Sequence, residues 1–339
     1  MYYQIISRVH SVSIWKYSTR FNPIIKPEYM LENECGETPL EVSDALYHSI
    51  GINHLKFKRE DLNPTGSHKD RSLLYQISAH LQDGAKSFSI SSSGNSLISA
   101  AYILKNNPKI SLKIFLSKNI SQRKLERLSQ TLNIQIESPK APSADINLDN
   151  IKIAFTAKPV SESIKFANQT NSILLRGSTD PYALQGPKTI SYELAGRGDQ
   201  IFIPTSSATT AYGIYLGYKD LLEEGEIEKI PEIHIVQSEA VNPIAREFDK
   251  SFEPKESSII SSIVDRIAHR KVEAIKAIKE TGGSGWVVSD EESIKAQDLL
   301  QKAGINSSIE GAMTIAALEK ATQNKYPLKN PICIITGTR

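Results

Sequence analysis

The chain of 339 residues is long enough for two domains, each with a substantial hydrophobic core. Its 40 basic and 38 acidic residues nearly cancel, so neither nucleic acid nor an anionic membrane is expected as a partner. Cys35 and Cys333 form no CxxC pair and have no ligand spacing, so we expect two buried thiols and no metal, rather than a zinc site or a disulfide framework. No apolar run approaches the length of a membrane span and no signal-peptide pattern is visible, so we expect a cytoplasmic protein.

Along the chain, short apolar runs that predict strands alternate with amphipathic stretches that predict helices. The expected strands are residues 54–58, 87–91, 112–116, 134–137, 151–155, 200–204, 232–236, 285–288 and 331–335. The expected helices are residues 68–81, 96–104, 122–132, 182–195, 209–222, 291–303 and 311–321. This alternation favours an α/β fold with parallel sheets covered by helices on both faces, and the strands suit two sheets better than one. Residues 138–150 predict a loop. Residues 251–285 form a long polar and helical segment, which we interpret as an insertion over the body of the protein that acts as a lid.

One lysine stands where a strand and a Pro-Thr-Gly turn lead into a helix. Ser67 followed by Asp70 resembles a capping box, which places Lys69 in the first helical turn. The positive end of the helix dipole disfavours an ammonium there, and a dry site leaves the amine neutral and able to condense with an aldehyde. The alternative is a capped helix whose lysine points into water.

Two further polar loops lie between a strand and a helix. The first, residues 89–96, presents hydroxyls, an amide and backbone N–H groups at a helix start, where anions bind. The second, residues 201–213, has the order that a phosphate cradle needs, although Ser-Ser-Ala-Thr-Thr replaces glycine at residues 206–210. Each loop has the alternative of an ordinary polar N-cap that binds nothing. Near the end of the chain, Thr336 stands in a polar turn that follows a predicted buried strand, where it could contact a ligand. The alternative is a core strand followed by a solvated turn.

The string Asn-Pro-Thr-Gly-Ser-His-Lys-Asp-Arg at residues 63–71 resembles the lysine motif of threonine synthases and their relatives in the tryptophan-synthase-β family. These are pyridoxal-phosphate (PLP) enzymes of fold type II, and only His68 departs, where the family usually has Phe. Residues 89–96 resemble the family's Ser-(Ser/Thr)-Gly-Asn loop. Further similarities lie at residues 36–40, 180–189, 236–239 and 289–292, so the resemblance spans roughly residues 35 to 338.

The resemblance implies two doubly wound three-layer αβα domains with mainly parallel sheets and PLP in the cleft between them. The smaller domain would span residues 69–170, and the larger would comprise residues 1–68 and 171–339. It also implies a homodimer that acts on a small amino-acid substrate.

The resemblance further assigns roles to individual residues. Lys69 would carry PLP as a Schiff base and act as general base at Cα, Asn95 would bond the 3′-oxygen of PLP, and Thr336 would face its pyridine nitrogen. The cofactor phosphate would lie on Ser206, Ser207, Ala208, Thr209 and Thr210. The substrate would contact Ser92, Ser93, Gly94, Ser96 and Lys188.

The activity that this implies is threonine synthase, which converts O-phospho-L-homoserine and water to L-threonine and phosphate. Where the family has an Asn and an Arg, this chain has Asp180 and Ala183, so another cation would have to replace the arginine; the candidates are Lys56, Lys58, Arg176 and Lys188. A threonine/serine dehydratase or another β-replacement enzyme of the same fold would not need that cation. A degenerate paralogue that binds a ligand or partner without catalysis is the third alternative, although such a protein has no need of the lysine.

Overall fold

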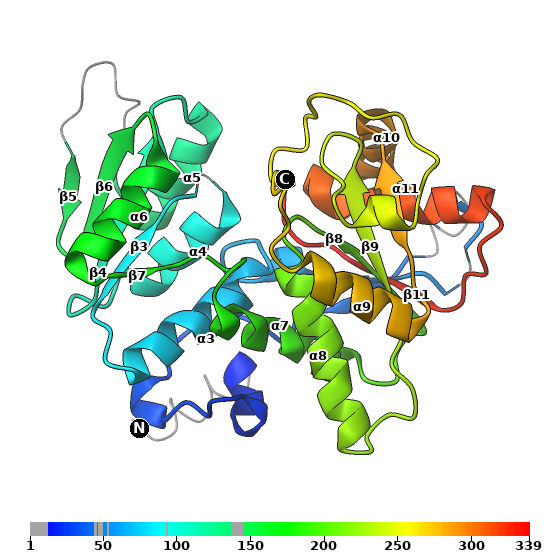
Figure 1. Ribbon diagram of the computed structural model, residues 1–339, viewed down its shortest axis with the longest axis horizontal. Coiled ribbons are helices and arrows are strands. Elements are labelled where there is room, and N and C mark those ends of the chain that lie inside the picture. Colours follow the sequence, from blue (N-terminus) through cyan, green and yellow to red (C-terminus); the bar gives the residue numbers. More distant parts are fainter. Residues whose placement is uncertain (1–12, 44–45, 47–49, 53, 93, 137–144) are drawn as a thin grey trace. The chain divides into compact units, whose positions relative to one another are not determined.

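The computed structural model describes residues 13–43, 46, 50–52, 54–92, 94–136 and 145–339. By its internal contacts the chain divides into two compact units, drawn in Figure 1. Unit 1 comprises the described residues of Met1–Cys35 and Lys69–Gly186, and unit 2 those of Gly36–His68 and Pro187–Arg339.

In the described part of unit 1, a five-stranded sheet has the order β5-β6-β4-β3-β7. Its strands are β3 (Ser87–Ile90), β4 (Ser111–Ser117), β5 (Ile146–Leu148), β6 (Ile151–Thr156) and β7 (Ile173–Leu174). Only the β5–β6 pair is antiparallel among these strands. The helices are α3 (Lys69–Gln82), α4 (Asn95–Leu104), α5 (Gln122–Leu132) and α6 (Pro159–Thr170), with 3-10 turns η1 (Ile14–Arg20), η2 (Pro27–Tyr29) and η4 (Pro181–Leu184).

Helices cover both faces of this sheet because neighbouring residues of a strand point to opposite sides. On β4, Ile114 belongs to the buried cluster that contains side chains of α3, α4 and α5. Its neighbour Phe115 contacts Phe166 of α6, with 5.6 Å between ring centroids. The sheet therefore lies between two helical layers (Figure 1).

The six-stranded sheet of unit 2 has the order β1-β2-β11-β8-β9-β10. Its strands are β1 (Leu40–Val42), β2 (Lys56–Lys58), β8 (Gln200–Pro204), β9 (Glu232–Ser238), β10 (Gly285–Val288) and β11 (Pro331–Ile334), and β1 alone of these is antiparallel. The helical elements are α7 (Gln185–Leu194), α8 (Thr209–Glu223), α9 (Lys271–Thr281), α10 (Asp290–Lys302) and α11 (Ile309–Gln323), with η3 (Glu60–Leu62) and η5 (Ala245–Glu247). One face packs on α10 and α11, while α8 and α9 contact β9.

Two mainly parallel sheets, each with helical layers, confirm the predicted α/β class. Because parallel strands end at the same edge of a sheet, the loops after β8, β9 and β11 all lie at the carboxyl edge in unit 2. This edge brings together the predicted phosphate loop and Thr336, which are far apart in the sequence.

Among the described residues, the units differ from the predicted domains at residues 13–35 and 171–186, which belong to unit 1. The physical reason is packing on α3. Phe21 lies against Tyr75 with 4.7 Å between ring centroids, and the Ser72 hydroxyl donates to the carbonyl of Ala183 at 2.7 Å.

Several predicted elements need correction. Residues 134–136 form no strand, and residue 137 lies outside the described part of the chain. The predicted loop 138–150 contains β5, with residues 138–144 again outside the description. The segment 251–285, predicted to be polar and helical, contains the helix α9. The predicted helix at 182–195 is the turn η4 followed by α7. The sequence analysis also missed β1, β7 and α6. Cys35 and Cys333 are free and buried, as predicted.

Candidate active site

A buried asparagine shapes the turn that leads to Lys69. The Asn63 amide donates to both the backbone oxygen and the side-chain Oε2 of Glu60, each at 2.9 Å. Gly66 then has a φ of +76°, and a Cβ added there would lie 2.6 Å from Cγ2 of Thr338. A positive φ and this close approach both require glycine at residue 66.

Lys69 is the first residue of α3, so its amine lies at the positive end of the helix dipole. The residue as a whole is half-buried, but its amine is surrounded by protein, and burial lowers its pKa to about 8. The next residue, Asp70, is fully buried and accepts a hydrogen bond from the Ser99 hydroxyl of α4 at 2.5 Å. This contact fixes the first turn of α3 against α4.

The carbonyl of Thr336 is bound by the two residues that precede Lys69. It accepts from the His68 N–H at 3.1 Å, from His68 Nδ1 at 2.7 Å and from the Ser67 hydroxyl at 3.3 Å. Because a carbonyl only accepts, the His68 ring carries its hydrogen on Nδ1. Within unit 2, His68, which stands where the family usually has Phe, therefore binds the turn after β11 to the turn at residues 66–68. Thr336 itself is buried, with 4% of its surface exposed.

The Ser-Gly-Asn loop follows β3 and leads directly into α4. Gly94 is the N-cap of this helix, and its N–H donates to the Ser92 hydroxyl at 3.2 Å. Asn95 is the first helical residue, and its Oδ1 accepts from Nη1 of Arg127 at 2.9 Å. With its oxygen bound in this way, the Asn95 amide offers its Nδ2 hydrogens to an acceptor. Ser96 is half-buried, and Ser93 lies outside the described residues.

Arg127 is a residue that the sequence analysis missed. It lies on α5, and burial together with the nearby Arg123 lowers its pKa from the ordinary arginine value. No local pattern marks it, because the contact with Asn95 joins residues 32 positions apart.

The predicted phosphate loop forms a tight helix start although it lacks glycine. Its left-handed residue is Ala208, with φ +69° and ψ 7°, which is the N-cap of α8. The first intrahelical bond runs from Tyr212 N to Ala208 O. The N–H groups of residues 209–211 therefore precede the helical ladder and suit an anion. The hydroxyls of Ser207 and Thr209 lie 3.1 Å apart at the same place.

A distant segment of unit 2 is attached to this loop. The Ser206 hydroxyl accepts from the N–H groups of Val264 and Asp265, each at 3.2 Å. Residues 264–265 belong to the segment predicted to be a lid, so this part of it packs against the phosphate loop.

The lysines considered as substrate cations have other partners. Lys188 Nζ, which was predicted to contact substrate, binds Oδ2 of Asp220 at 2.8 Å. Lys58 binds Glu193 at 2.5 Å, and both side chains are buried. Lys56 donates to the carbonyl of Arg197 at 2.6 Å. A carboxylate that neutralises an ammonium removes much of its attraction for a phosphate.

Asp180, at the position of the family's Asn, is part of a polar cluster in unit 1. Its Oδ2 accepts from Gln76 and His80, each at 2.6 Å, and its Oδ1 caps η4 through the Tyr182 N–H. Burial pushes the pKa of Asp180 upward, but the hydrogen bonds from His80 and Gln76 bring it below its ordinary value. Ala183, at the position of the family's Arg, is fully buried.

A cavity of about 670 Å³ lies beside this cluster, between the end of α6 and β7. His80, Asn168 and Asp180 contribute to its wall, and none of the predicted site residues does. Among the described residues, no group of three or more His, Cys, Asp or Glu side chains is arranged to hold a metal ion. Within the same residues, no helix is both long and apolar enough to span a membrane.

Comparison with curated proteins gives similarity over most of the chain. It is 28% identical over 338 residues to a threonine synthase of Methanosarcina acetivorans, covering 96% of this chain and 79% of the relative. It is 27% identical over 345 residues to a threonine synthase of Methanocaldococcus jannaschii, covering 97% of this chain and 81% of that relative.

Solved structures share the fold at low sequence identity. Maize serine racemase has a TM-score of 0.71 at 17% identity, covering 96% of this chain and 92% of the other. Threonine deaminase isoform 2 of Solanum lycopersicum has a TM-score of 0.69 at 17% identity, covering 96% and 84%.

The family model described as pyridoxal-phosphate dependent enzyme matches residues 31–337. The local structure fits this cofactor: a buried amine with a lowered pKa lies at one helix start, and the left-handed residue Ala208 begins another helix, ahead of its first intrahelical bond. The chain therefore belongs to the pyridoxal-phosphate-dependent enzyme family.

Proposed function

We propose that this protein is a threonine synthase that converts O-phospho-L-homoserine and water to L-threonine and phosphate. The observation that carries the proposal is Lys69, whose buried amine has a pKa of about 8 at the start of α3. The threonine synthases of Methanosarcina acetivorans and Methanocaldococcus jannaschii, similar over nearly the whole chain, support this reaction.

In this proposal Lys69 binds the cofactor covalently and, once released, takes the proton from the substrate Cα. Bound PLP withdraws electrons from the substrate and makes that proton acidic. Asn95, whose oxygen already accepts from Arg127, would donate to the ring oxygen of the cofactor. The hydroxyl of the buried residue Thr336 would be a weak partner for the ring nitrogen. We assign the substrate carboxylate to Ser92, Gly94 and Ser96, whose loop opens α4.

We assign the cofactor phosphate to residues 206–210. Support comes from the left-handed Ala208 and from the N–H groups that precede the α8 ladder. Lys188 is left out of the proposal because Asp220 already binds its ammonium.

One observation favours a threonine or serine dehydratase as the second candidate. The positions of the family's Asn and Arg carry Asp180, whose lowered pKa keeps it anionic, and the buried Ala183. An anion is a poor neighbour for a phosphorylated substrate, whereas a substrate with a hydroxyl leaving group needs no such cation.

Purified protein mixed with PLP tests the first part of the proposal. We expect visible absorbance that borohydride bleaches, with the reduced cofactor on Lys69 by peptide mass spectrometry. A colourless mixture without this adduct would support the degenerate paralogue and overturn the enzyme. The K69A variant is the control for adducts on other lysines.

Two assays then separate the candidate reactions. A threonine synthase releases phosphate from O-phospho-L-homoserine, whereas a dehydratase forms 2-oxobutyrate from threonine. Oxoacid formation without phosphate release would exclude the synthase. We also propose a cytoplasmic homodimer, and light scattering of the holoenzyme would contradict the dimer if it gave the mass of one chain.

A further inference from the structure

Gln237 is a fully buried amide near the end of β9, with 0% of its surface exposed. Its Nε2 donates to the carbonyl of Thr205 at 3.1 Å and to that of Ser206 at 3.4 Å. Its Oε1 accepts from the N–H groups of Ile244 and Ala245, each at 2.9 Å. An amide has two hydrogens to donate and two lone pairs to accept with, so these contacts use its full capacity. They also fix which end of the amide is oxygen.

One side of this contact is a rigid part of unit 2. Ala245 begins η5, and a Cβ added to Gly285 of β10 would lie 2.6 Å from the Ala245 Cα. The backbone of η5 is thus packed directly against the sheet. Gln237 uses this fixed backbone as its anchor and reaches from it to the first residues of the phosphate loop.

The other side of the contact sets the direction of two peptide groups. In a planar trans peptide the C=O and the following N–H point in opposite directions. When the carbonyls of Thr205 and Ser206 point toward Gln237, the N–H groups of Ser206 and Ser207 point away from it. Those N–H groups precede the N-cap Ala208 in the loop that leads to the first turn of α8.

We propose that Gln237 is the positioning residue of the phosphate loop: it holds two carbonyls so that the N–H groups of Ser206 and Ser207 face the phosphate of PLP. This inference rests on the proposed phosphate site at residues 206–210. Gln237 acts through the loop backbone and does not itself touch the cofactor.

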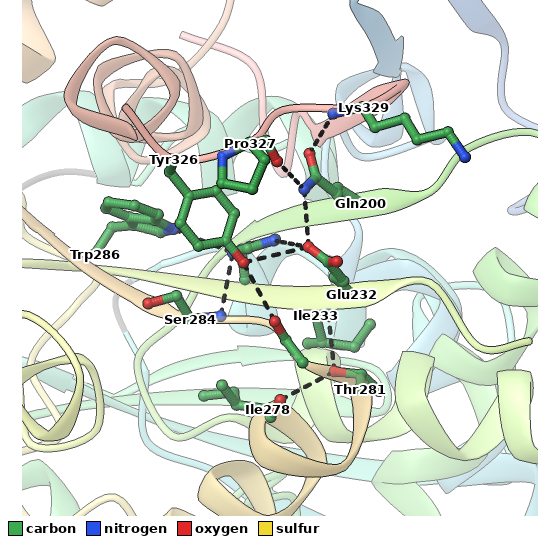
Figure 2. A network of polar contacts seen from close by, with 12 residues as sticks. Gln200, Glu232, Ile233, Ile278, Thr281, Ser284, Trp286, Tyr326, Pro327 and Lys329 are labelled. Atoms are coloured by element: carbon green, nitrogen blue, oxygen red, sulfur yellow. Dashed lines mark hydrogen bonds and ion pairs between the residues drawn. The ribbon is translucent and has the colours of Figure 1, made fainter. Parts of the chain in front are cut away.

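A matched control stands at the opposite end of the same sheet. Gln200 is the first residue of β8 and is 2% exposed. Its Nε2 donates to Glu232 Oε2 at 2.8 Å and to the carbonyl of Pro327 at 2.9 Å, and its Oε1 accepts from the Lys329 N–H at 2.9 Å. Figure 2 shows this network around Gln200. Both glutamines are buried amides bound to backbone, but only Gln237 contacts the phosphate loop.

The test compares PLP with pyridoxal, which has the same aldehyde and ring but no phosphate. The affinity of each is measured from the visible absorbance of the lysine adduct in the wild type, Q237M and Q200M. We expect Q237M to weaken PLP binding about tenfold, because two hydrogen bonds to the loop are lost. Its pyridoxal affinity should stay within about twofold of the wild type. Q200M should lower the thermal midpoint but leave the ratio of the two affinities unchanged.

A second variant and a spectrum keep the test decisive if Q237M folds poorly. Q237E is nearly isosteric, but it cannot donate to both Thr205 and Ser206: the carboxylate has no hydrogen to donate, and the protonated acid has one. We expect the same selective loss of PLP affinity and a shifted ³¹P resonance for the bound phosphate. Unchanged affinity ratios in the folded variants would overturn the role of Gln237 alone. A wild-type protein that binds PLP no more tightly than pyridoxal would overturn the phosphate site itself.

Discussion

Asn95 accepts a hydrogen bond from Arg127, with 2.9 Å between Oδ1 and Nη1. This contact uses the oxygen of the Asn95 amide and leaves the Nδ2 hydrogens for an acceptor, which would be the ring oxygen of PLP in the proposed site. An amide without such a contact can present either its oxygen or its nitrogen. The contact with Arg127 therefore selects the orientation in which Asn95 can donate.

Replacing Arg127 with Met should weaken PLP binding about fivefold, because the Asn95 amide loses a charged donor that fixes its orientation. The measurement is a titration of the apoprotein with PLP, followed by absorbance. R123M is the control, since Arg123 is exposed on the same helix. Equal affinities in R127M and the wild type would show that the contact does not orient Asn95.

The rate at which the apoprotein condenses with PLP should depend on the protonation of Lys69. Burial lowers its pKa to about 8, and only the neutral amine reacts. The rate should rise about tenfold per pH unit below that pKa and level off above it. Stopped-flow absorbance measures this profile from about pH 6 to about pH 10, roughly two pH units on either side of the expected pKa. A rate that keeps rising toward the ordinary lysine pKa of 10.5 would contradict the buried amine.

K69A should give no adduct and lose at least about a thousandfold in turnover.

Replacing Ala208 with glycine should stabilise the folded protein. Its φ of +69° is costly for an L-residue with a Cβ, whereas glycine adopts it freely. We expect A208G to raise the free energy of unfolding of the apoprotein by about 0.5–1 kcal/mol in urea. A211G, two residues into the same helix, should lower it by about 1 kcal/mol. If A208G were less stable than the wild type, the turn would not have the left-handed conformation described.

His234 should make the stability of the protein depend on pH. It is fully buried and stacks on Phe202, and its Nδ1 accepts from Trp286 Nε1 and from the Ser284 N–H, each at 3.2 Å. Figure 2 shows Trp286 and Ser284 in this network beside Glu232. Burial lowers the pKa of His234 below 6.5, although Glu232 opposes the shift. Below pH 6.5 the unfolded chain therefore binds a proton that the folded chain does not.

The free energy of unfolding should accordingly fall as the pH drops below about 6.5, by up to about 1.4 kcal/mol per unit from this group, and H234F should lack that contribution. H234F should also lose about 1–3 kcal/mol at neutral pH, because two donors stay unpaired. Urea unfolding at pH values between about 5 and 7, a range that spans the start of the expected fall in stability, measures both effects. H54N, at an exposed histidine, is the control. The same pH slope in H234F and the wild type would rule out His234 as its source.

Local patterns predicted the elements that carry their own periodicity. The bounds of α5 and β8 match the predicted 122–132 and 200–204. The edge strands β5 and β7 were missed because each is only two or three residues long, too short to show an alternating pattern. The strand β7 is also formed by pairing with the distant β3. The helix α9 lies within a segment that was predicted to be polar and helical, but its bounds were not predicted, although Ala274, Ala277 and Ile278 have helical spacing.

The sequence by itself determined the family resemblance, the α/β class and the lysine at a helix start, because a strand, a turn with Gly66 and a helix are encoded within a few residues. Tertiary structure decided which polar groups have partners. It paired Lys188 with Asp220, brought His68 into contact with the carbonyl of Thr336, and placed Gln237 where its amide binds the backbone of the phosphate loop. These contacts join residues tens to hundreds of positions apart, and a hydrogen bond depends on where the fold brings two atoms rather than on their spacing in the chain.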